Sequence, residues 1–369
     1  MKVVPGVDVL LAAPREYLGF DGIGLVTNPT GVTAHLESTI DAFYKHEEIK
    51  LTAVFGPEHG AMGDIQDALD VPSHRDPYTG LSVYSLYGDH RAPTGEMLDG
   101  IDTLVFDIQD CGSRFYTYVS TLTHCMESAA KHGVKMVVLD RPNPINGVTV
   151  EGNVLEQGYK SFIGLHPIPI RHGLTTGELA SLINNAVMCD LKVVTIKGWQ
   201  RDSWFDETGL SWVQPSPNLP TIDTAVGYPG TCFFEGVNVS EGRGTTRPFE
   251  YLGAPWIDEK KWAESLNRIG LPGVRFRGCY FTPTFWRFKD TRCSGVQIHV
   301  TDRDLFKPVE TGIRLLSTLK ELHSDEFKFN EPSYDSRRHF DLLAGTDKLR
   351  IHLEQGTPME DIVDTWEAG

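Results

Sequence analysis

Four short segments carry the residue types best suited to chemistry: carboxylates, amides, an arginine and a tyrosine. They supply the candidates Asn28, Glu58, His59, Asp107, Asp110, Arg114, Tyr116 and Asn143. Glu58 and His59 stand between Gly-Pro and Gly, and a turn requires neither a glutamate nor a histidine. We therefore interpret this pair, together with Asp110, as catalytic and the other candidates as substrate-binding. Carboxylates of this kind suit general acid/base work on a neutral bond such as a glycoside.

The remaining candidates also have structural interpretations, which the sequence leaves open. Asn28 and Asn143 stand beside prolines and could simply form turns. One of Asp107 and Asp110 could form a structural ion pair with Arg114.

A second charged group lies in residues 235–250, where three glutamates and two arginines stand among glycines. It contributes the substrate-binding candidates Glu235, Glu241 and Arg243. The glycines on either side of Arg243 would let the backbone approach a ligand closely, although a solvated loop is the alternative. Asn218 is a further candidate, because the proline-rich stretch 215–220 is either a stiff linker or one wall of a cleft.

Several nucleotide, metal and hydrolase motifs are absent from the sequence. It contains no GxGxxG or GxxxxGKS/T phosphate loop, no HExxH and no GxSxG. Histidines and cysteines form no dense group with the spacing of metal ligands. We therefore expect no bound nucleotide, no metal and no other cofactor.

The hydrophobic pattern predicts the elements that position these residues. Short apolar runs typical of strands buried on both faces occur at 24–27, 51–55, 103–108, 135–139 and 191–196. Helical spacing follows at 119–129 and 179–187, the second helix beginning with a capping box at Thr175–Glu178. This alternation predicts an α/β fold, a Rossmann-like, mostly parallel sheet with helices on both faces. Candidates that follow strands then lie at the carboxyl edge, where such sheets bind ligands.

From about residue 215 the sequence is rich in proline and glycine, which indicates a change of architecture. A helix near 259–268, a strand at 295–300 and a helix at 309–322 follow. We predict a smaller C-terminal α+β domain here. The predicted division is a Rossmann-like catalytic domain at 1–220 and an auxiliary domain at 221–369 that completes the cleft.

Composition limits the classes of partner. The 369 residues carry 34 Lys and Arg against 50 Asp and Glu, a net charge of −16, which disfavours nucleic acid and anionic membrane surfaces. No apolar run approaches the roughly 20 residues of a membrane span, and the N-terminus lacks the pattern of a signal peptide, so we expect a cytoplasmic protein. The six cysteines form no CxxC pair, and we expect them to be reduced and buried.

Six motifs in order resemble the exo-β-N-acetylmuramidase family of NamZ type. They are VFGPEHG (54–60), DIQDCGSRFYTY (107–118), DRPNP (140–144), HGLTTGELA (172–180), PSPNLP (215–220) and EGVNVSEGRGTTRPFE (235–250). The stretch 281–300 is also similar, so the resemblance extends from about residue 20 to near the C-terminus.

The resemblance implies an exo-acting glycosidase that removes N-acetylmuramic acid from the non-reducing end of peptidoglycan fragments, with Glu58 as the catalytic carboxylate. It implies a cleft between a Rossmann-like and a smaller domain, a muropeptide or disaccharide substrate, and muropeptide recycling inside the cell. The substrate's acetamide could act as internal nucleophile. Its lactyl carboxylate requires an arginine, for which Arg114, Arg171 and Arg243 are candidates, and Glu151 joins the substrate-binding set. The alternatives are a non-catalytic muropeptide binder and a sugar- or nucleotide-phosphate enzyme.

Overall fold

The computed structural model describes residues 2–19, 21–63, 73–332, 336–358 and 360–362, and the chain divides into two compact units. The first unit comprises Met1–Gly112, Tyr116–Val148 and Gly173–Pro220. The second comprises Ser113–Phe115, Thr149–His172 and Thr221–Gly369. We expected domains at 1–220 and 221–369, and the structure groups two earlier segments, 113–115 and 149–172, with the residues after 220.

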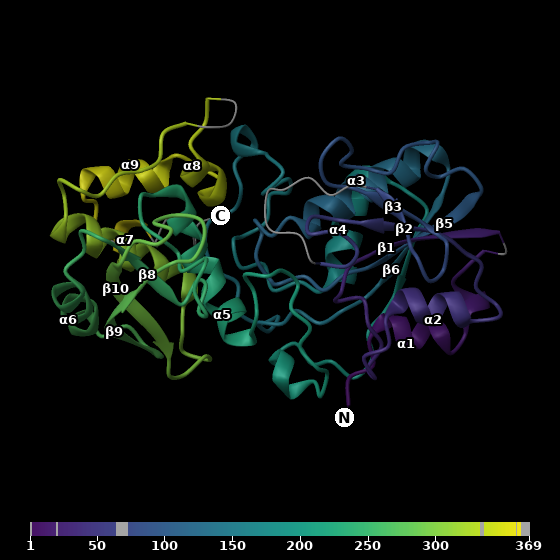
Figure 1. Ribbon diagram of the computed structural model, residues 1–369, viewed down its shortest axis with the longest axis horizontal. Coiled ribbons are helices and arrows are strands. Elements are labelled where there is room, and N and C mark those ends of the chain that lie inside the picture. The colour runs from purple at the N-terminus through teal and green to yellow at the C-terminus, as the bar shows by residue number, and fades with distance from the viewer. Residues whose placement is uncertain (1, 20, 64–72, 333–335, 359, 363–369) are drawn as a thin grey trace. The chain divides into compact units, whose positions relative to one another are not determined.

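A seven-stranded sheet of order β3-β4-β2-β1-β5-β6-β7 forms the centre of the first unit (Figure 1). Its strands are β1 (Gly22–Thr27), β2 (Leu51–Gly56), β3 (His74–Arg75), β4 (Ser82–Ser85), β5 (Ile101–Asp107), β6 (Lys135–Leu139) and β7 (Leu191–Val194). Neighbouring strands are parallel, except β3 and β4, which are antiparallel. The mostly parallel sheet is confirmed, and each of the five predicted strands falls on an observed one.

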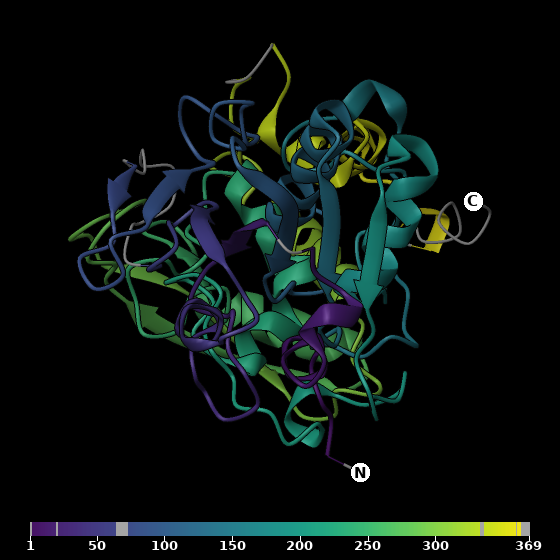
Figure 2. The ribbon, with the colours of Figure 1, turned by 90° about the vertical axis from the view of Figure 1, so that its right-hand side faces the viewer.

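Helices cover both faces of this sheet, as the view in Figure 2 also shows. On one face lie α1 (Gly6–Leu11) and α2 (Thr39–Lys45), and on the other α3 (Tyr118–His132) packs beside α4 (Thr176–Val187). The core on the first face includes Val7, Leu10, Leu25, Phe43 and Val105. The predicted capping box of α4 is confirmed, because the Thr175 hydroxyl accepts from the Glu178 N–H and the Glu178 carboxylate accepts from the Thr175 N–H.

The second unit is α+β. A three-stranded antiparallel sheet has the order β8-β10-β9, with β8 (Tyr251–Ala254), β9 (Val274–Phe281) and β10 (Cys293–Val300). Its helices are α5 (Ile222–Thr231), α6 (Glu259–Ile269), α7 (Pro308–Leu322), α8 (His339–Ala344) and α9 (Lys348–Gln355). Helix α6 packs on β9 and β10, and α5 packs on α7. The predicted helices at 259–268 and 309–322 and the predicted strand at 295–300 are confirmed.

All six cysteines are buried free thiols, as the sequence analysis predicted. Among the described helices, none has the length and apolar character needed to cross a membrane.

Candidate functional site

Glu58 lies on a tight turn at the carboxyl end of β2. The Gly60 N–H donates to the Pro57 carbonyl at 2.9 Å and closes the turn. His59, in the third position, has φ +71°, a left-handed conformation that turns normally assign to glycine or asparagine. A Cβ on Gly56 would stand 2.4 Å from the Ala61 nitrogen, so glycine is required where the strand enters the turn. Such strain at a non-glycine residue is typical of functional sites.

The half-buried Glu58 carboxylate accepts a hydrogen bond from the hydroxyl of Thr117, with Oε2 and Oγ1 2.7 Å apart. Burial, and next the nearby Glu58 carboxylate, raise the pKa of Tyr87. The same two causes, in the same order, raise the pKa of Tyr118, whose hydroxyl donates to the Pro215 carbonyl at 2.5 Å. Glu58 therefore stands beside phenols that stay protonated, and the Thr117 hydroxyl donates to its carboxylate.

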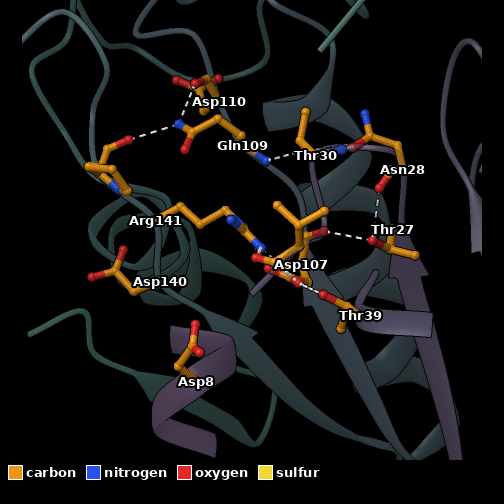
Figure 3. Close-up of polar contacts among 12 residues, drawn as sticks. Asp8, Thr27, Asn28, Thr30, Thr39, Asp107, Gln109, Asp110, Asp140 and Arg141 are labelled. Carbon is orange, nitrogen blue, oxygen red and sulfur yellow. Dashed lines mark hydrogen bonds and ion pairs between the residues drawn. The ribbon is translucent and has the colours of Figure 1, made fainter. Parts of the chain in front are cut away.

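Beside this turn, the loops that follow β1 and β5 meet where the strand order reverses, the usual ligand-binding point of such sheets (Figure 3). Asn28 Oδ1 accepts from the N–H and the hydroxyl of Thr30 at 3.0 and 2.5 Å. The Thr30 hydroxyl in turn accepts from the Gln109 N–H at 2.9 Å. Asp110 Oδ2 accepts from the Gly112 N–H at 2.7 Å. These bonds fix Asn28 and Asp110 at the carboxyl edge of the sheet.

The amide nitrogen of Asn28 lies near the Tyr118 hydroxyl. Burial and then the Glu58 carboxylate raise the pKa of Tyr118, and Asn28 offsets part of that rise. The amide nitrogen makes no hydrogen bond of ordinary geometry with the described residues. Tyr116 packs edge-on against Tyr118, with ring centroids 4.9 Å apart. Asn28, Tyr116 and Tyr118 therefore belong to one local arrangement around Glu58.

Asp107 forms a buried ion pair with Arg141, not with Arg114 (Figure 3). The guanidinium Nε and Nη2 donate to its two oxygens at 2.6 and 2.9 Å, and the Thr39 hydroxyl donates at 2.5 Å. The suggested pairing with Arg114 is wrong because β5 and β6 are neighbours, which brings the residues at their carboxyl ends together. Asp107 is fully buried, so these contacts describe a structural role.

The two other amide candidates of the first unit are also buried. Asn143 Nδ2 donates to the Leu174 carbonyl at 3.0 Å, and its Oδ1 accepts from the Ile145 N–H at 3.1 Å. The backbone N–H of Asn218 donates to the Ser216 hydroxyl at 3.2 Å. Asn143 thus stabilises the loop that follows β6, in agreement with its turn interpretation.

Arg114 lies in the second unit, and its guanidinium is occupied by backbone carbonyls. Nη1 donates to Asn153 and Ile168 at 2.6 and 2.9 Å, and Nη2 to Leu343 and Ala344 at 3.1 and 2.7 Å. Burial lowers the pKa of Arg114 to about 9. The last two carbonyls belong to the C-terminal end of α8, where a cation is favourable. Through these hydrogen bonds Arg114 connects three segments of its own unit.

The backbones of Glu151 and Arg171 exchange two hydrogen bonds. The Arg171 N–H donates to the Glu151 carbonyl at 2.9 Å, and the Glu151 N–H donates to the Arg171 carbonyl at 3.1 Å. The Glu151 carboxylate accepts from the Glu310 N–H at 2.7 Å, in the first turn of α7. Burial raises the pKa of Glu151 to about 7, although the hydrogen bond from Glu310 and the positive charge of Arg171 both lower it. Burial also lowers the pKa of Arg171 to about 10. The two residues join the 149–172 segment to α7.

The charged group at 235–250 forms a compact network in the second unit. Arg243 Nη1 lies 2.9 Å from Glu235 Oε1 and 2.8 Å from Glu241 Oε1. His339 Nε2 lies 3.2 Å from the other Glu235 oxygen. Burial alone would raise the pKa of Glu235, but Arg243 and His339 lower it to about 2. The cation Arg287, which the sequence analysis missed, lies beside the same carboxylates.

The structure separates the candidates into two groups, one in each unit. The first unit holds Asn28, Glu58, His59, Asp107, Asp110, Tyr116, Asn143 and Asn218, and the second holds Arg114, Glu151, Arg171, Glu235, Glu241 and Arg243. The sequence analysis missed Thr117, although it lies in a quoted motif, and Tyr87, which follows the unpredicted strand β4. Among the described residues, no three or more His, Cys, Asp or Glu side chains are grouped so that they could hold a metal ion.

Known proteins match this chain over almost its whole length. Models of one family, described as exo-beta-N-acetylmuramidase NamZ, match with their N-terminal part at residues 23–223 and their C-terminal part at 226–369. The peptidoglycan beta-N-acetylmuramidase NamZ of Bacillus subtilis (strain 168) is 49% identical over 368 residues, covering 99% of this chain and 88% of that protein.

Two crystal structures of DUF1343 family proteins from Bacteroides fragilis NCTC 9343 are similar in fold. One has a TM-score of 0.91 at 40% identity, and the match covers 99% of this chain and 94% of that chain. The other has a TM-score of 0.77 at 29% identity, covering 100% and 95%.

Proposed function

The chain belongs to the NamZ family of exo-β-N-acetylmuramidases, and from this premise we propose how its residues act on their substrate. It is a glycoside hydrolase that releases N-acetylmuramic acid from the non-reducing end of peptidoglycan fragments. We propose that Glu58 is its general acid and base. The observation that carries this role is the half-buried carboxylate held by Thr117 on a strained turn at the ligand-binding edge of a parallel sheet.

In the first step, Glu58 gives its proton to the glycosidic oxygen while the bond from that oxygen to the anomeric carbon breaks. The acetamide oxygen of N-acetylmuramic acid forms the new bond to the anomeric carbon, so that the enzyme needs no nucleophile of its own. Water then attacks the same carbon while the bond from this carbon to the acetamide oxygen breaks, and it gives its proton to Glu58, which restores the acid. A polar group has to orient the acetamide and stabilise its developing charge, and Asp110 is our candidate because its carboxylate is fixed at the same edge.

Arg243 is our first candidate to bind the lactyl carboxylate. A guanidinium recognises a carboxylate through two parallel hydrogen bonds, which requires donors that a ligand can reach. Arg243 is partly exposed, whereas Arg114 and Arg171 are buried. The glycines beside Arg243 both have left-handed φ angles, which keeps the loop close to its neighbours.

Three finer expectations stay predictions. We propose a muropeptide or disaccharide as the form of the substrate, a cytoplasmic location, and a cleft completed by the second domain. Cell fractionation tests the location. A muropeptide binder without catalysis, the alternative from another class, would release no dye from a chromogenic muramide.

The decisive experiment is Glu58→Gln, which keeps the shape of the side chain and removes the ionisable proton. General acid/base assistance contributes 10²–10⁴-fold, so kcat on the natural disaccharide should fall by about that factor while binding is retained. The loss should be smaller on a dinitrophenyl glycoside, whose leaving group needs no proton. Glu47→Gln, on an exposed glutamate of the same unit, is the matched control. Near wild-type turnover of Glu58→Gln on the disaccharide would refute the assignment.

A further inference from the structure

Thr117 occupies the N-cap position of α3 but does not cap that helix. Its backbone already has helical angles, φ −65° and ψ −15°, and its side chain makes no capping hydrogen bond. A threonine in this position usually accepts from an N–H of the first turn, which stabilises the helix. The Thr117 hydroxyl instead donates to Glu58 Oε2 at 2.7 Å.

Other N-cap residues of this chain use their hydroxyls in the ordinary way. Thr175 accepts from the Glu178 N–H at the start of α4, and Thr221 accepts from the Thr224 N–H at the start of α5. Ser38 accepts from the Ile40 N–H at the start of α2. The 15-residue helix α3 therefore lacks the hydroxyl cap that α2, α4 and α5 have, and the hydroxyl that could supply it contacts Glu58.

This hydrogen bond ties the Glu58 carboxylate to the start of α3. A hydroxyl can donate to the ionised carboxylate and accept from the protonated one, so Thr117 can hold Glu58 Oε2 in both forms. We propose that Thr117 is a positioning residue that fixes the orientation of the Glu58 carboxylate for proton transfer. This proposal rests on the proposed role of Glu58 as general acid.

The groups that face Glu58 from other elements support the same arrangement. Tyr87, after β4, and Tyr118, in the first turn of α3, both interact with the carboxylate as neutral phenols. Tyr116 adds a weaker interaction of the same kind, and His59 adjoins Glu58 in the turn. The Arg91 guanidinium lies 4.2 Å from the centre of the Tyr87 ring. The Thr117 hydroxyl lies 2.7 Å from Glu58 Oε2, so the loss of this contact should act directly on the carboxylate.

The test replaces the hydroxyl and keeps the shape. Hydrogen bonds to charged groups are worth about 1.5–3 kcal/mol, which corresponds to roughly a 10- to 100-fold loss. We expect Thr117→Val to lower kcat on the natural disaccharide by about that factor, with KM within about twofold of wild type. The loss should be smaller on a dinitrophenyl glycoside, whose leaving group needs no proton, whereas a purely structural role would affect both substrates equally. Thr117→Ser should restore both properties.

The matched control is Thr123→Val on the same helix, where the lost hydroxyl bonds to the Val119 carbonyl at 2.8 Å. Wild-type kcat in Thr117→Val, an equal loss on the disaccharide and the dinitrophenyl glycoside, or the same changes in Thr123→Val, would overturn the proposal. Thr117→Ala is a second variant with the same expected profile, in case valine is not accommodated. If Glu58→Gln is inactive while Thr117→Val behaves as wild type, this inference alone fails. If Glu58→Gln is active, the proposed function fails.

Discussion

The buried ion pair between Asp107 and Arg141 predicts a large loss of stability when one partner is removed. Their side chains are 0% and 5% exposed, so neither charge is solvated. In Arg141→Leu, Asp107 would keep the Thr39 hydroxyl as donor and lose two charged hydrogen bonds of 2.6 and 2.9 Å. Breaking a buried pair in this way costs about 3–5 kcal/mol, because the remaining charge has no compensation.

Urea unfolding of Arg141→Leu measures the lost free energy of unfolding, and thermal unfolding measures the accompanying fall in melting temperature. In a unit of this size, a loss of 1 kcal/mol lowers the melting temperature by about 2–4 °C, so it should fall by about 6–20 °C. The double variant Asp107→Leu/Arg141→Leu should recover most of the stability, because no buried charge is left unpaired.

The exposed pair of Arg15 and Glu48 supplies the control. Its atoms are 2.7 Å apart, but the side chains are 70% and 38% exposed, so Arg15→Leu should cost no more than about 1 kcal/mol. A loss of less than 1 kcal/mol in Arg141→Leu would refute the reasoning, and so would a double variant less stable than the single one. Should Asp107 bind substrate as well, the double variant would show a raised KM despite its recovered stability.

Two further predictions concern the second unit. The pKa of Glu151 is about 7 in the folded chain against an ordinary 4.5. Folding therefore favours the protonated carboxyl, and this contribution to stability is present below pH 4.5 and is lost as the pH rises through 7. Urea unfolding between pH 4 and 8 should therefore give a flatter stability profile for Glu151→Gln than for wild type, and equal slopes would contradict this. Arg243→Gln should lower kcat/KM for muramic acid substrates at least tenfold more than for N-acetylglucosamine analogues, which lack the lactyl carboxylate. Arg114→Gln should affect both sugars equally through folding, and equal losses in Arg243→Gln would exclude Arg243 as the lactyl-binding residue.

Prediction from sequence was least successful where glycine and proline were dense. The sequence analysis predicted no helix between residues 221 and 231, yet the structure has helix α5 there with Gly227, Pro229 and Gly230. The reason is tertiary, because a Cβ on Gly230 would stand 1.8 Å from the Pro308 carbonyl oxygen. A Cβ on Gly312 would likewise stand 2.3 Å from the Gly230 oxygen. These glycines let the backbones of α5 and α7 touch, and helix propensity alone does not report such a contact.

The sequence by itself determined the parallel sheet, its helices and the turn that carries Glu58 and His59. These features depend on local pattern: continuous apolar runs for buried strands, a capping box for α4, and glycines around a turn. Tertiary structure decided the partners of the charges. Asp107 meets Arg141 because β5 and β6 are neighbours, and Arg114 meets four carbonyls because its segment packs in the second unit. Strand order and packing bring together residues far apart in the chain, and no local spacing encodes which of several arginines a carboxylate will meet.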